Sequence, residues 1–594
     1  MKLHTHFLRR IFPLGLAAML AVSSLTGCQK KPPEDSTELG ISIEENDAFE
    51  TFTKDLFLKE IAANTVNLHY CLEDPAAMGI TDYEISLGNF SKEARDSSSS
   101  YLKETLSEVL AFDYDMLSLE NQLTYDLLID YLNTQLSLCK YDLYQEPLAF
   151  SGGMQMQLPI LYAEYEFGCE QDVKDYLEVI ALTDEFFDQV MDFEAEKSDK
   201  NMFMSPDLCQ LVIDSCESFL SDMENHYLIT SFASRLEELD ISDQKKASYT
   251  RQNLAILEKQ LFPSYEKMIT DLNKLKDTGK NELGICNFEE GKKYYELLVY
   301  SETGCEEPVD AIFRRIENQR MSDLLACAKL QEQNENIIDE STSLKWKMDS
   351  PDAMLTSLQS AILEDFPSPP DSNYEINLVN PALEDYLAPA FYIVAPIDNY
   401  TDNVIYINNS YISSDIYAFT TLAHEGYPGH LYQTVMTYTY GYPMVRSILD
   451  YSGYVEGWAT YIEMMSYEYA GLDKDIAKFL SHNQAATLSL YASSDIGLHY
   501  YGWTFDDMKA FWAGYGITNE ATIKQITQLI LSEPGNYLKY YIGYIEFLEL
   551  KDYAKDLFGN EYTDKKFHQA ILDIGPASFS ILEKYLPKYY SPQT

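Results

Sequence analysis

The sequence predicts a large, mainly α-helical protein that carries one small antiparallel β-sheet. Three observations support this fold class. Apolar residues recur at helical spacing over most of the chain, glycine and proline cluster between these stretches, and short β-prone runs are confined to one region after residue 366. A chain of 594 residues with 46% hydrophobic residues can bury a large core. Its length favours two or more lobes over one small domain.

Residues 1–27 form a leader that is not part of the fold. A basic start with Lys2, Arg9 and Arg10 precedes an apolar stretch that is too short to span a bilayer comfortably. The leader ends in Leu-Thr-Gly followed by Cys28, which resembles a bacterial lipoprotein signal with Cys28 as the lipidated residue. The alternative is an ordinary secretory leader with an incidental cysteine. The polar, proline-bearing residues 28–46 then act as a tether. We therefore expect an extracytoplasmic protein that is lipid-anchored to the bacterial cell membrane.

Residues 47–365 are expected to form a helical lobe. The apolar residues Leu106, Val109 and Leu110 show the helical spacing, whereas the serine run at 96–100 and residues 277–280 are predicted to be surface loops. No internal repeat is visible. Eight cysteines follow Cys28, and their even number and exported location permit disulfides. Scattered buried thiols are the alternative, because free cysteine is commonly a small core residue.

Residues 366–594 are expected to form a catalytic lobe that combines the small β-sheet with helices. The runs 391–394 and 403–408 are predicted strands, and 395–400 is the turn that joins them. Helix returns at about residue 415 and continues to the end. The strand pair either offers an edge to which an extended peptide could add, or only packs under the helices.

The segment His-Glu-Gly-Tyr-Pro-Gly-His at residues 424–430 is the strongest functional signal. It resembles the zinc-protease pattern in which two histidines four residues apart flank a glutamate, but here they are six residues apart. In a regular helix this spacing separates the two imidazoles by about 240°. Pro428 cannot donate a helical hydrogen bond and the two glycines allow unusual backbone angles. We therefore predict a helix that breaks at 426–429 and returns His430 to the side of His424.

A second carboxylate completes the predicted zinc site. Glu456 is the expected third ligand of Zn²⁺, on a helix over 444–470 whose polar face repeats at Glu456, Thr460 and Glu463. Three protein ligands leave a position for water, and Glu425 would act as the general base. Glu463 either orients a ligand from behind or is a solvated surface charge.

The charge of the chain limits its partners. The net charge of −52 becomes −55 when the leader is removed with its three basic residues. This excess argues against nucleic acid and anionic lipid as partners. It is compatible with cationic peptides, but a solvated, self-repelling extracytoplasmic surface explains it better.

The chain resembles the bacterial domain-of-unknown-function 885 family, whose members look like relatives of the zinc peptidases with a glutamate as third ligand. The resemblance runs over most of residues 47–585. It implies a zincin-like helical fold with a deep channel, a zinc ion and peptidase activity. The segments that carry it are 424–430, 454–461, 495–503, 534–543, 567–568 and 575–576.

The resemblance also implies roles for single residues. It indicates His424, His430 and Glu456 as ligands and Glu425 as base. It makes His499 and Tyr540 candidate donors to the oxyanion of the tetrahedral intermediate. The alternatives for these two are a hydrogen-bonded core histidine and one more tyrosine among 47.

The chain departs from the family pattern at two positions. Tyr491 stands where many members have arginine, and Tyr537 stands where a small residue is common. Substrate preference is therefore not carried over.

The leading functional prediction is a surface-anchored, zinc-dependent peptidase that hydrolyses short peptides. A lipoprotein that binds peptides or another ligand around a non-catalytic metal site is one alternative. A hydrolase of another amide, such as a cell-wall peptide, is a second. Glu425 favours the enzymes, because a structural zinc site needs no general base. Nothing in the sequence predicts the oligomeric state.

Overall fold

The computed structural model describes residues 41–590 apart from 151, 380, 382–383, 385–386 and 411–414. Helices make up most of this part of the chain and one small sheet accompanies them, which confirms the mainly α-helical class. The predicted leader and Cys28 lie outside the described residues. α1 begins at Ile43, inside the predicted tether 28–46. No helix in the described part is both long and apolar enough to cross a membrane.

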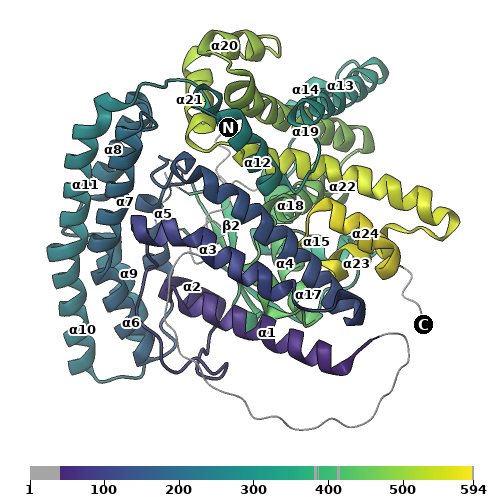
Figure 1. Ribbon diagram of the computed structural model, residues 1–594. Helices are drawn as coiled ribbons and strands as arrows, with labels where there is room; N and C mark the ends of the chain where they lie inside the picture. Colours follow the sequence, from purple (N-terminus) through teal and green to yellow (C-terminus); the bar gives the residue numbers. More distant parts are fainter. Residues whose placement is uncertain are drawn as a thin grey trace.

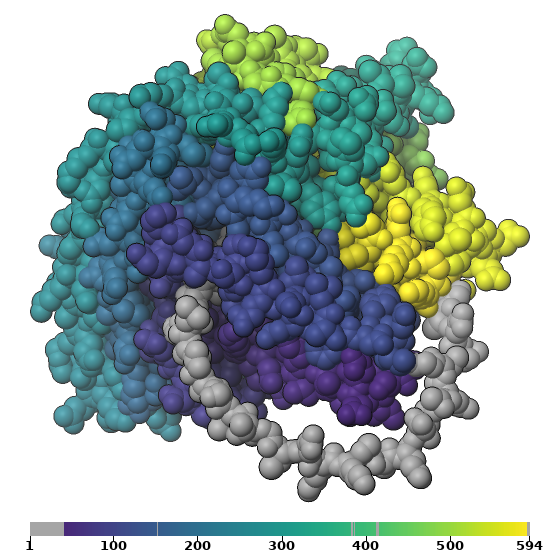
Figure 2. All heavy atoms as spheres, viewed as in Figure 1, coloured from purple at the N-terminus to yellow at the C-terminus, as the bar shows by residue number. Residues whose placement is uncertain are grey.

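The first helices form one face of the molecule (Figures 1 and 2). They are α1 (Ile43–Ala62), α2 (Thr65–Cys71), α3 (Lys92–Val109) and α4 (Leu119–Leu138), with the 3-10 turns η2 (Tyr114–Met116) and η3 (Cys139–Tyr144). The prediction of a loop at 96–100 is wrong, because these residues lie inside α3. Ser91 caps α3 by accepting the Ala94 N–H, and the helix buries Leu102 and Val109 on one side.

A second group of long helices stands beside the first, at the left of Figure 1. Their apolar faces meet in a core of their own, which draws mostly on residues 148–272. The members are α5 (Met154–Glu164), α6 (Glu170–Ala181), α7 (Thr183–Asp199), α8 (Pro206–Phe219), α9 (Tyr227–Glu238), α10 (Asp243–Ile256), η4 (Leu257–Leu261), α11 (Phe262–Leu275) and η5 (Lys276–Thr278).

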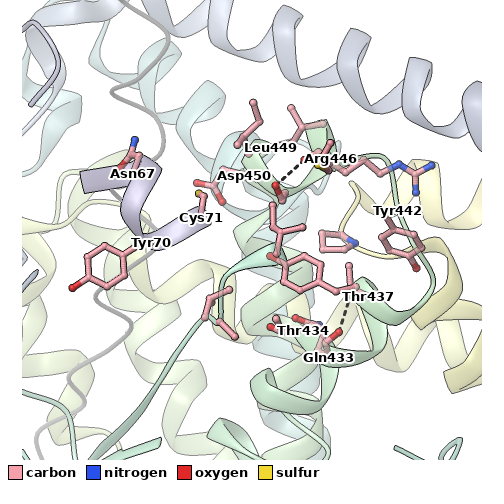
Figure 3. A pocket seen from close by; sticks show the side chains of 18 of the residues that line it. Asn67, Tyr70, Cys71, Gln433, Thr434, Thr437, Tyr442, Arg446, Leu449 and Asp450 are labelled. Carbon is pink, nitrogen blue, oxygen red and sulfur yellow. Dashed lines mark hydrogen bonds between the residues drawn. The ribbon is translucent and has the colours of Figure 1, made fainter. Parts of the chain in front are cut away.

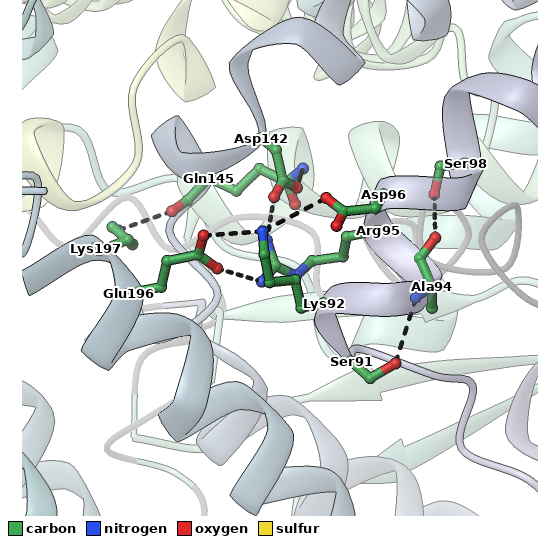
Figure 4. A network of polar contacts seen from close by, with 10 residues as sticks. All are labelled: Ser91, Lys92, Ala94, Arg95, Asp96, Ser98, Asp142, Gln145, Glu196 and Lys197. Carbon is green, nitrogen blue, oxygen red and sulfur yellow. Dashed lines mark hydrogen bonds and ion pairs between the residues drawn. The ribbon is translucent and has the colours of Figure 1, made fainter. Parts of the chain in front are cut away.

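Charged side chains tie these two groups together (Figure 4). Arg95 of α3 pairs with Asp142 of η3 and, at 2.8 Å, with Glu196 of α7. Lys92 reaches the same Glu196 at 3.1 Å. The side chain of Arg95 is only 8% exposed, so its guanidinium links the two helix groups from a largely buried position.

The remaining helices fill the other side of the molecule, and α20 and α21 stand at the top of Figure 1. Before the sheet come η6 (Ile285–Asn287), α12 (Gly291–Thr303), α13 (Val309–Gln333), α14 (Ile337–Thr342) and α15 (Pro351–Ala361). After it come α16 (Ile416–Glu425), α17 (His430–Thr439), η9 (Met444–Ile448), α18 (Ser452–Tyr469), α19 (Lys474–Ile496), η10 (Gly497–Tyr501), α20 (Phe505–Ala513), α21 (Glu520–Ser532), α22 (Asn536–Phe558), η11 (Gly559–Glu561), α23 (Asp564–Ile574) and α24 (Phe579–Tyr590).

The sheet has three strands in the order β1-β3-β2. β2 (Ala390–Ile393) and β3 (Asp402–Ile407) pair antiparallel around the 3-10 turn η8 (Ile397–Asn399), as predicted. β1 (Asn373–Leu378) pairs parallel with β3, so the prediction of a purely antiparallel sheet is wrong. A parallel neighbour needs a long crossover, which strand pattern alone does not reveal.

The main core joins both predicted lobes. Phe49 and Leu132 from the first helices share one cluster with Ile312, Trp458 and Phe547 from the rest of the chain. The predicted division at residue 365 therefore does not coincide with the division between the two large cores. Cysteines do not link them either, because all eight described after residue 40 are free thiols.

Candidate metal centre

The helix that carries the first histidine breaks where the sequence predicts. α16 ends with His424 and Glu425, and α17 begins at His430. Asp415 caps the start of α16 by accepting the N–H of Tyr417 at 3.1 Å. The four residues between the two helices replace a turn of regular helix, so the two histidines are freed from the unfavourable spacing that a continuous helix would impose.

Gly429 makes this close return possible. A Cβ atom at Gly429 would overlap the carbonyl oxygens of His424 and Ala423, so only a glycine fits against the end of α16. The next carbonyl back, that of Pro428, accepts a 2.8 Å hydrogen bond from the indole N–H of Trp458 on α18. The conformation of the break therefore requires glycine at position 429, and a hydrogen bond from Trp458 holds the break against α18.

Three side chains converge at the break. The ligand atoms of His424, His430 and Glu456 all lie within 4.8 Å of one another, and all three residues are buried. Oε2 of Glu456 is 3.5 Å from Nε2 of His430 and 3.8 Å from Nε2 of His424. The two imidazole rings stand nearly perpendicular, with centroids 4.8 Å apart. Both rings thus direct the same nitrogen toward one carboxylate.

This donor set fits a zinc ion. Tetrahedral zinc with bonds of about 2.0–2.1 Å places its ligand atoms about 3.3–3.4 Å apart. The separations from Glu456 are 3.5 and 3.8 Å and no two of the ligand atoms are more than 4.8 Å apart, so the three side chains would have to draw closer together to reach these values. Two histidines and one carboxylate are also the ligands of zinc sites that perform hydrolysis.

Glu463 supports the site from behind. It follows Glu456 by two turns on α18, and its Oε2 lies 3.4 Å from Nδ1 of His424, the ring nitrogen that faces away from Glu456. Gln484 donates to its other oxygen at 3.2 Å. Of the two sequence alternatives, the geometry favours the one in which this carboxylate orients a ligand histidine.

The pKa of His424 is governed by these acids. Burial opposes a charge on the ring, but the hydrogen bond to Glu463 and the charges of Glu425, Glu463 and Glu456 outweigh it. Together they raise the pKa of His424 to about 9. The pocket therefore attracts positive charge, which is the electrostatic condition for holding a cation.

Glu425 lies between His424 and the edge of the sheet. Its Oε2 accepts a 3.0 Å hydrogen bond from the backbone N–H of Tyr392 in β2, and its side chain is buried. In an antiparallel pair, alternate residues direct their backbone groups to opposite edges. Because the N–H of Tyr392 reaches Glu425 and not β3, the outer edge of β2 faces the candidate site.

His499 is held by backbone groups and not by the metal cluster. Its Nδ1 accepts from the N–H of Ile285 at 3.2 Å, and its Nε2 bonds the carbonyl of Ile530 at 3.0 Å. Burial lowers the pKa of His499 to about 4, so the ring is neutral and its single N–H donates to Ile530. No N–H is then left to donate to an oxyanion. The geometry therefore fits a hydrogen-bonded core histidine better than a catalytic one.

Asp495, in the same sequence segment, also serves the scaffold. It is fully buried, accepts the N–H of Gly535 at 3.0 Å, and accepts the hydroxyl of Tyr295. The Asp-Ile-Gly-Leu-His segment thus joins α12, α19 and the start of α22.

Tyr540 lies on a helix that contacts the helix of Glu456. α22 crosses α18 where Gly457 meets Gly543, and a Cβ at Gly457 would lie 2.5 Å from the Cα of Gly543. Tyr540 is buried and lies one turn before Gly543 on α22. Glu456 lies directly before Gly457 on α18, so both residues are close to the point where the two helices cross. The structure therefore brings the two elements together, and the role of Tyr540 as an oxyanion donor stays a prediction.

Three buried polar residues near the site were not singled out as site residues. Gln433 and Thr434 follow His430 on α17, and Thr460 lies between Glu456 and Glu463 on α18. The signal that could have found the first two is their position three and four residues after a ligand, on the same side of the helix.

The comparisons with known proteins agree with the fold. The sequence model of a family described as "Bacterial protein of unknown function (DUF885)" matches residues 74–586. A candidate lipoprotein from Colwellia psychrerythraea has a crystal structure similar to this chain, with a TM-score of 0.79 and 16% identity over 93% of this chain and 99% of that one. A candidate lipoprotein of unknown function from Shewanella oneidensis is similar with a TM-score of 0.62 and 15% identity, over 91% of this chain and 99% of that one. No protein with a curated description matches.

Proposed function

Because this chain belongs to the DUF885 family of bacterial proteins, whose function is unknown, we propose its activity from its own site: it is a zinc-dependent peptidase. The observation that carries the proposal is the convergence of His424, His430 and Glu456 beside the carboxylate of Glu425. Three protein ligands leave a coordination position open, as in catalytic zinc sites, whereas a structural zinc ion usually has four protein ligands and needs no general base.

The residues divide the work of peptide hydrolysis. His424, His430 and Glu456 would hold the zinc ion, which would supply polarisation of the scissile carbonyl and a lowered pKa for a water molecule. Glu425 accepts the proton of the attacking water and returns it to the leaving amine. The N–H of Tyr392 holds the Glu425 carboxylate in place. Glu463 fixes the ring of His424.

The substrate proposed for this site is an extended peptide. The outer edge of β2 faces Glu425, and such an edge can bind a peptide backbone as an added strand. The three ligands are between 2% and 8% exposed, so an unfolded segment reaches them more readily than a folded protein does. Tyr540 is the proposed donor to the oxyanion, since His499 is already engaged. A cell-wall stem peptide contains the same kind of amide bond, so it is included among the substrates that we propose.

The place of action follows from the leader. The signal that ends at Cys28 and the two candidate lipoproteins of similar fold support a lipid anchor on the extracytoplasmic side of the membrane. An anchor of this kind would hold the enzyme at a surface where peptides arrive by diffusion.

The test combines metal analysis with a peptide library. We expect the purified protein to contain about one zinc per chain and to yield defined cleavage products by mass spectrometry. Glu425→Gln should keep its zinc and lose hydrolysis by at least about 100-fold, because it removes the base and no ligand. His430→Ala should lose zinc. Full turnover by Glu425→Gln refutes the assignment, and a zinc-free protein with bound peptide favours the carrier alternative.

A further inference from the structure

A cavity of about 120 Å³ opens between α17, the end of β2, α2 and the segment 443–450 (Figure 3). Gln433, Thr434 and Thr437 come from α17, while Asn67 and Tyr70 approach from α2 on the opposite side. The cavity is smaller than the roughly 300–1,000 Å³ of pockets that hold whole small molecules. Its volume suits a single side chain.

Two elements lead from the candidate metal centre into this cavity. Gln433 and Thr434 follow the ligand His430 by three and four residues, so their Cβ atoms lie about 5–6 Å from its own. The backbone of Tyr392 is bonded to Glu425, and the next residues of the chain, 393–395, line the cavity. A peptide in extended form advances about 3.3 Å per residue. The cavity is therefore within about two substrate residues of the reacting bond.

The floor of the cavity contains hydrogen-bonding groups that the protein itself does not use. The side chain of Gln433 is 1% exposed, and neither its amide nitrogen nor its amide oxygen has a partner within the described part of the chain. The hydroxyl of Thr434, 5% exposed, also has none there. Buried polar groups are normally satisfied, so these three atoms point to a ligand that supplies the missing bonds.

The charged groups at the cavity wall already have partners, apart from Nη1 of Arg446, which is buried and has none within the described residues. The guanidinium of Arg446 donates to the Thr124 hydroxyl at 2.9 Å and pairs with the Glu120 carboxylate at 2.6 Å. The carboxylate of Asp450 accepts the hydroxyl of Ser452 at 2.6 Å. Because the charge of Arg446 is already paired with Glu120, an acidic side chain would enter this mostly apolar pocket without a counter-charge of its own, which is unfavourable.

We propose that this cavity is the specificity pocket of the peptidase and that it takes a neutral carboxamide side chain, glutamine or asparagine, next to the scissile bond. A carboxamide offers one acceptor and two donors, which complement the amide of Gln433 and the hydroxyl of Thr434. Its methylene groups suit the apolar walls formed by Leu161, Ile397 and Met444. The proposal rests on the proposed function and specifies its substrate class.

The test measures binding and cleavage of four peptides, Ala-Ala-Ala-Xaa-Ala-Ala with Gln, Asn, Leu or Glu at Xaa. Binding is measured by calorimetry on the zinc-loaded Glu425→Gln variant. The value of kcat/KM is measured on the protein that retains Glu425. We expect the Gln peptide to exceed the Leu and Glu peptides by about 10- to 100-fold in both, since a site built for hydrogen bonds rejects ligands that lack them. Gln433→Leu and Thr434→Val should each reduce this ratio, and Gln433→Leu should bring it close to one. Gln252→Leu, at an exposed position of α10, is the matched control and should leave the ratio unchanged.

The outcomes separate the two proposals. Equal binding of the Gln and Leu peptides, or an unchanged ratio in Gln433→Leu, overturns the pocket while hydrolysis can still stand. Selective binding that depends on Gln433 without any hydrolysis supports the pocket and overturns the peptidase. Binding of none of the four peptides overturns the pocket. Circular dichroism of each variant confirms that it folds, and Thr434→Val provides the readout if Gln433→Leu does not.

Discussion

The carboxylate of Glu463 should control how tightly the site holds zinc. It lies 3.4 Å from Nδ1 of His424, opposite the nitrogen that faces Glu456. Replacing it in Glu463→Gln keeps the shape of the side chain and an acceptor for Gln484, but removes the negative charge. The change therefore isolates the electrostatic support of one ligand from the packing of the helix.

The size of the effect follows from the distance. Two unit charges 3.4 Å apart attract by about 5 kcal/mol at an effective dielectric constant of about 20. This is an upper bound, because the Glu463 side chain is 18% exposed and the imidazole bears only part of the charge of a bound ion. Partners of ligand histidines typically contribute 10- to 100-fold in metal affinity. We expect a loss in this range, or about 1.4–2.7 kcal/mol.

The assay is competition for zinc against a chromophoric chelator of known affinity. Glu468→Gln is the matched control, since Glu468 lies on the same helix and is exposed. It should bind zinc like the native protein. A Glu463→Gln variant with native zinc affinity and native circular dichroism would refute the reasoning, because the contact would then have no bearing on the metal.

Two further predictions concern the scaffold of the site. Gly429→Ala should weaken zinc binding and destabilise the fold by about 1–3 kcal/mol, because its Cβ would overlap backbone oxygens of α16. Chelator competition measures the zinc affinity and thermal unfolding measures the stability. Gly168→Ala is the control, because a Cβ there meets only a carboxylate oxygen at 3.5 Å. Asp495 should make stability fall with rising pH, since burial raises the pKa of its carboxyl to about 7 and the folded state keeps a proton that the unfolded state releases. The free energy of unfolding should fall by up to about 1.4 kcal/mol per unit between about pH 4 and 7, and urea titrations should find a smaller slope for Asp495→Asn. An equal slope in Asp495→Asn, or native zinc affinity in Gly429→Ala, contradicts the respective account.

The convergence of the candidate metal ligands could be predicted from the sequence because the break between the two histidines is signalled locally. The Pro428–Gly429 pair predicts a break in the helix between the two histidines, and the structure shows that break between residues 425 and 430. Glu456 could be chosen because it follows on the polar face of the next long helix. The break is signalled within the motif itself, whereas Glu456 lies on the next long helix and is predicted from the spacing of its polar face.

The role of His499 could not be predicted in the same way. Its two partners are backbone groups of Ile285 and Ile530, 214 and 31 residues away along the chain. A histidine in a family motif looks equally suited to catalysis and to satisfying buried backbone groups. The difference depends on which distant segments pack against it, and the same holds for β1, whose parallel partner arrives through a long crossover.

The way α18 is anchored explains why the side chains of His424, His430 and Glu456 lie close together. Gly457 lies directly against Gly543, so α18 cannot move closer to α22 or turn a larger side chain toward it. One residue further on, Trp458 bonds the carbonyl of Pro428 and thereby fixes the turn that places His430. Glu456 is thus held on the same short stretch of helix that positions the histidine it faces. Packing therefore holds the three candidate ligands close to the arrangement that a zinc ion would require, and the proposed activation of a water molecule would depend on this preorganisation.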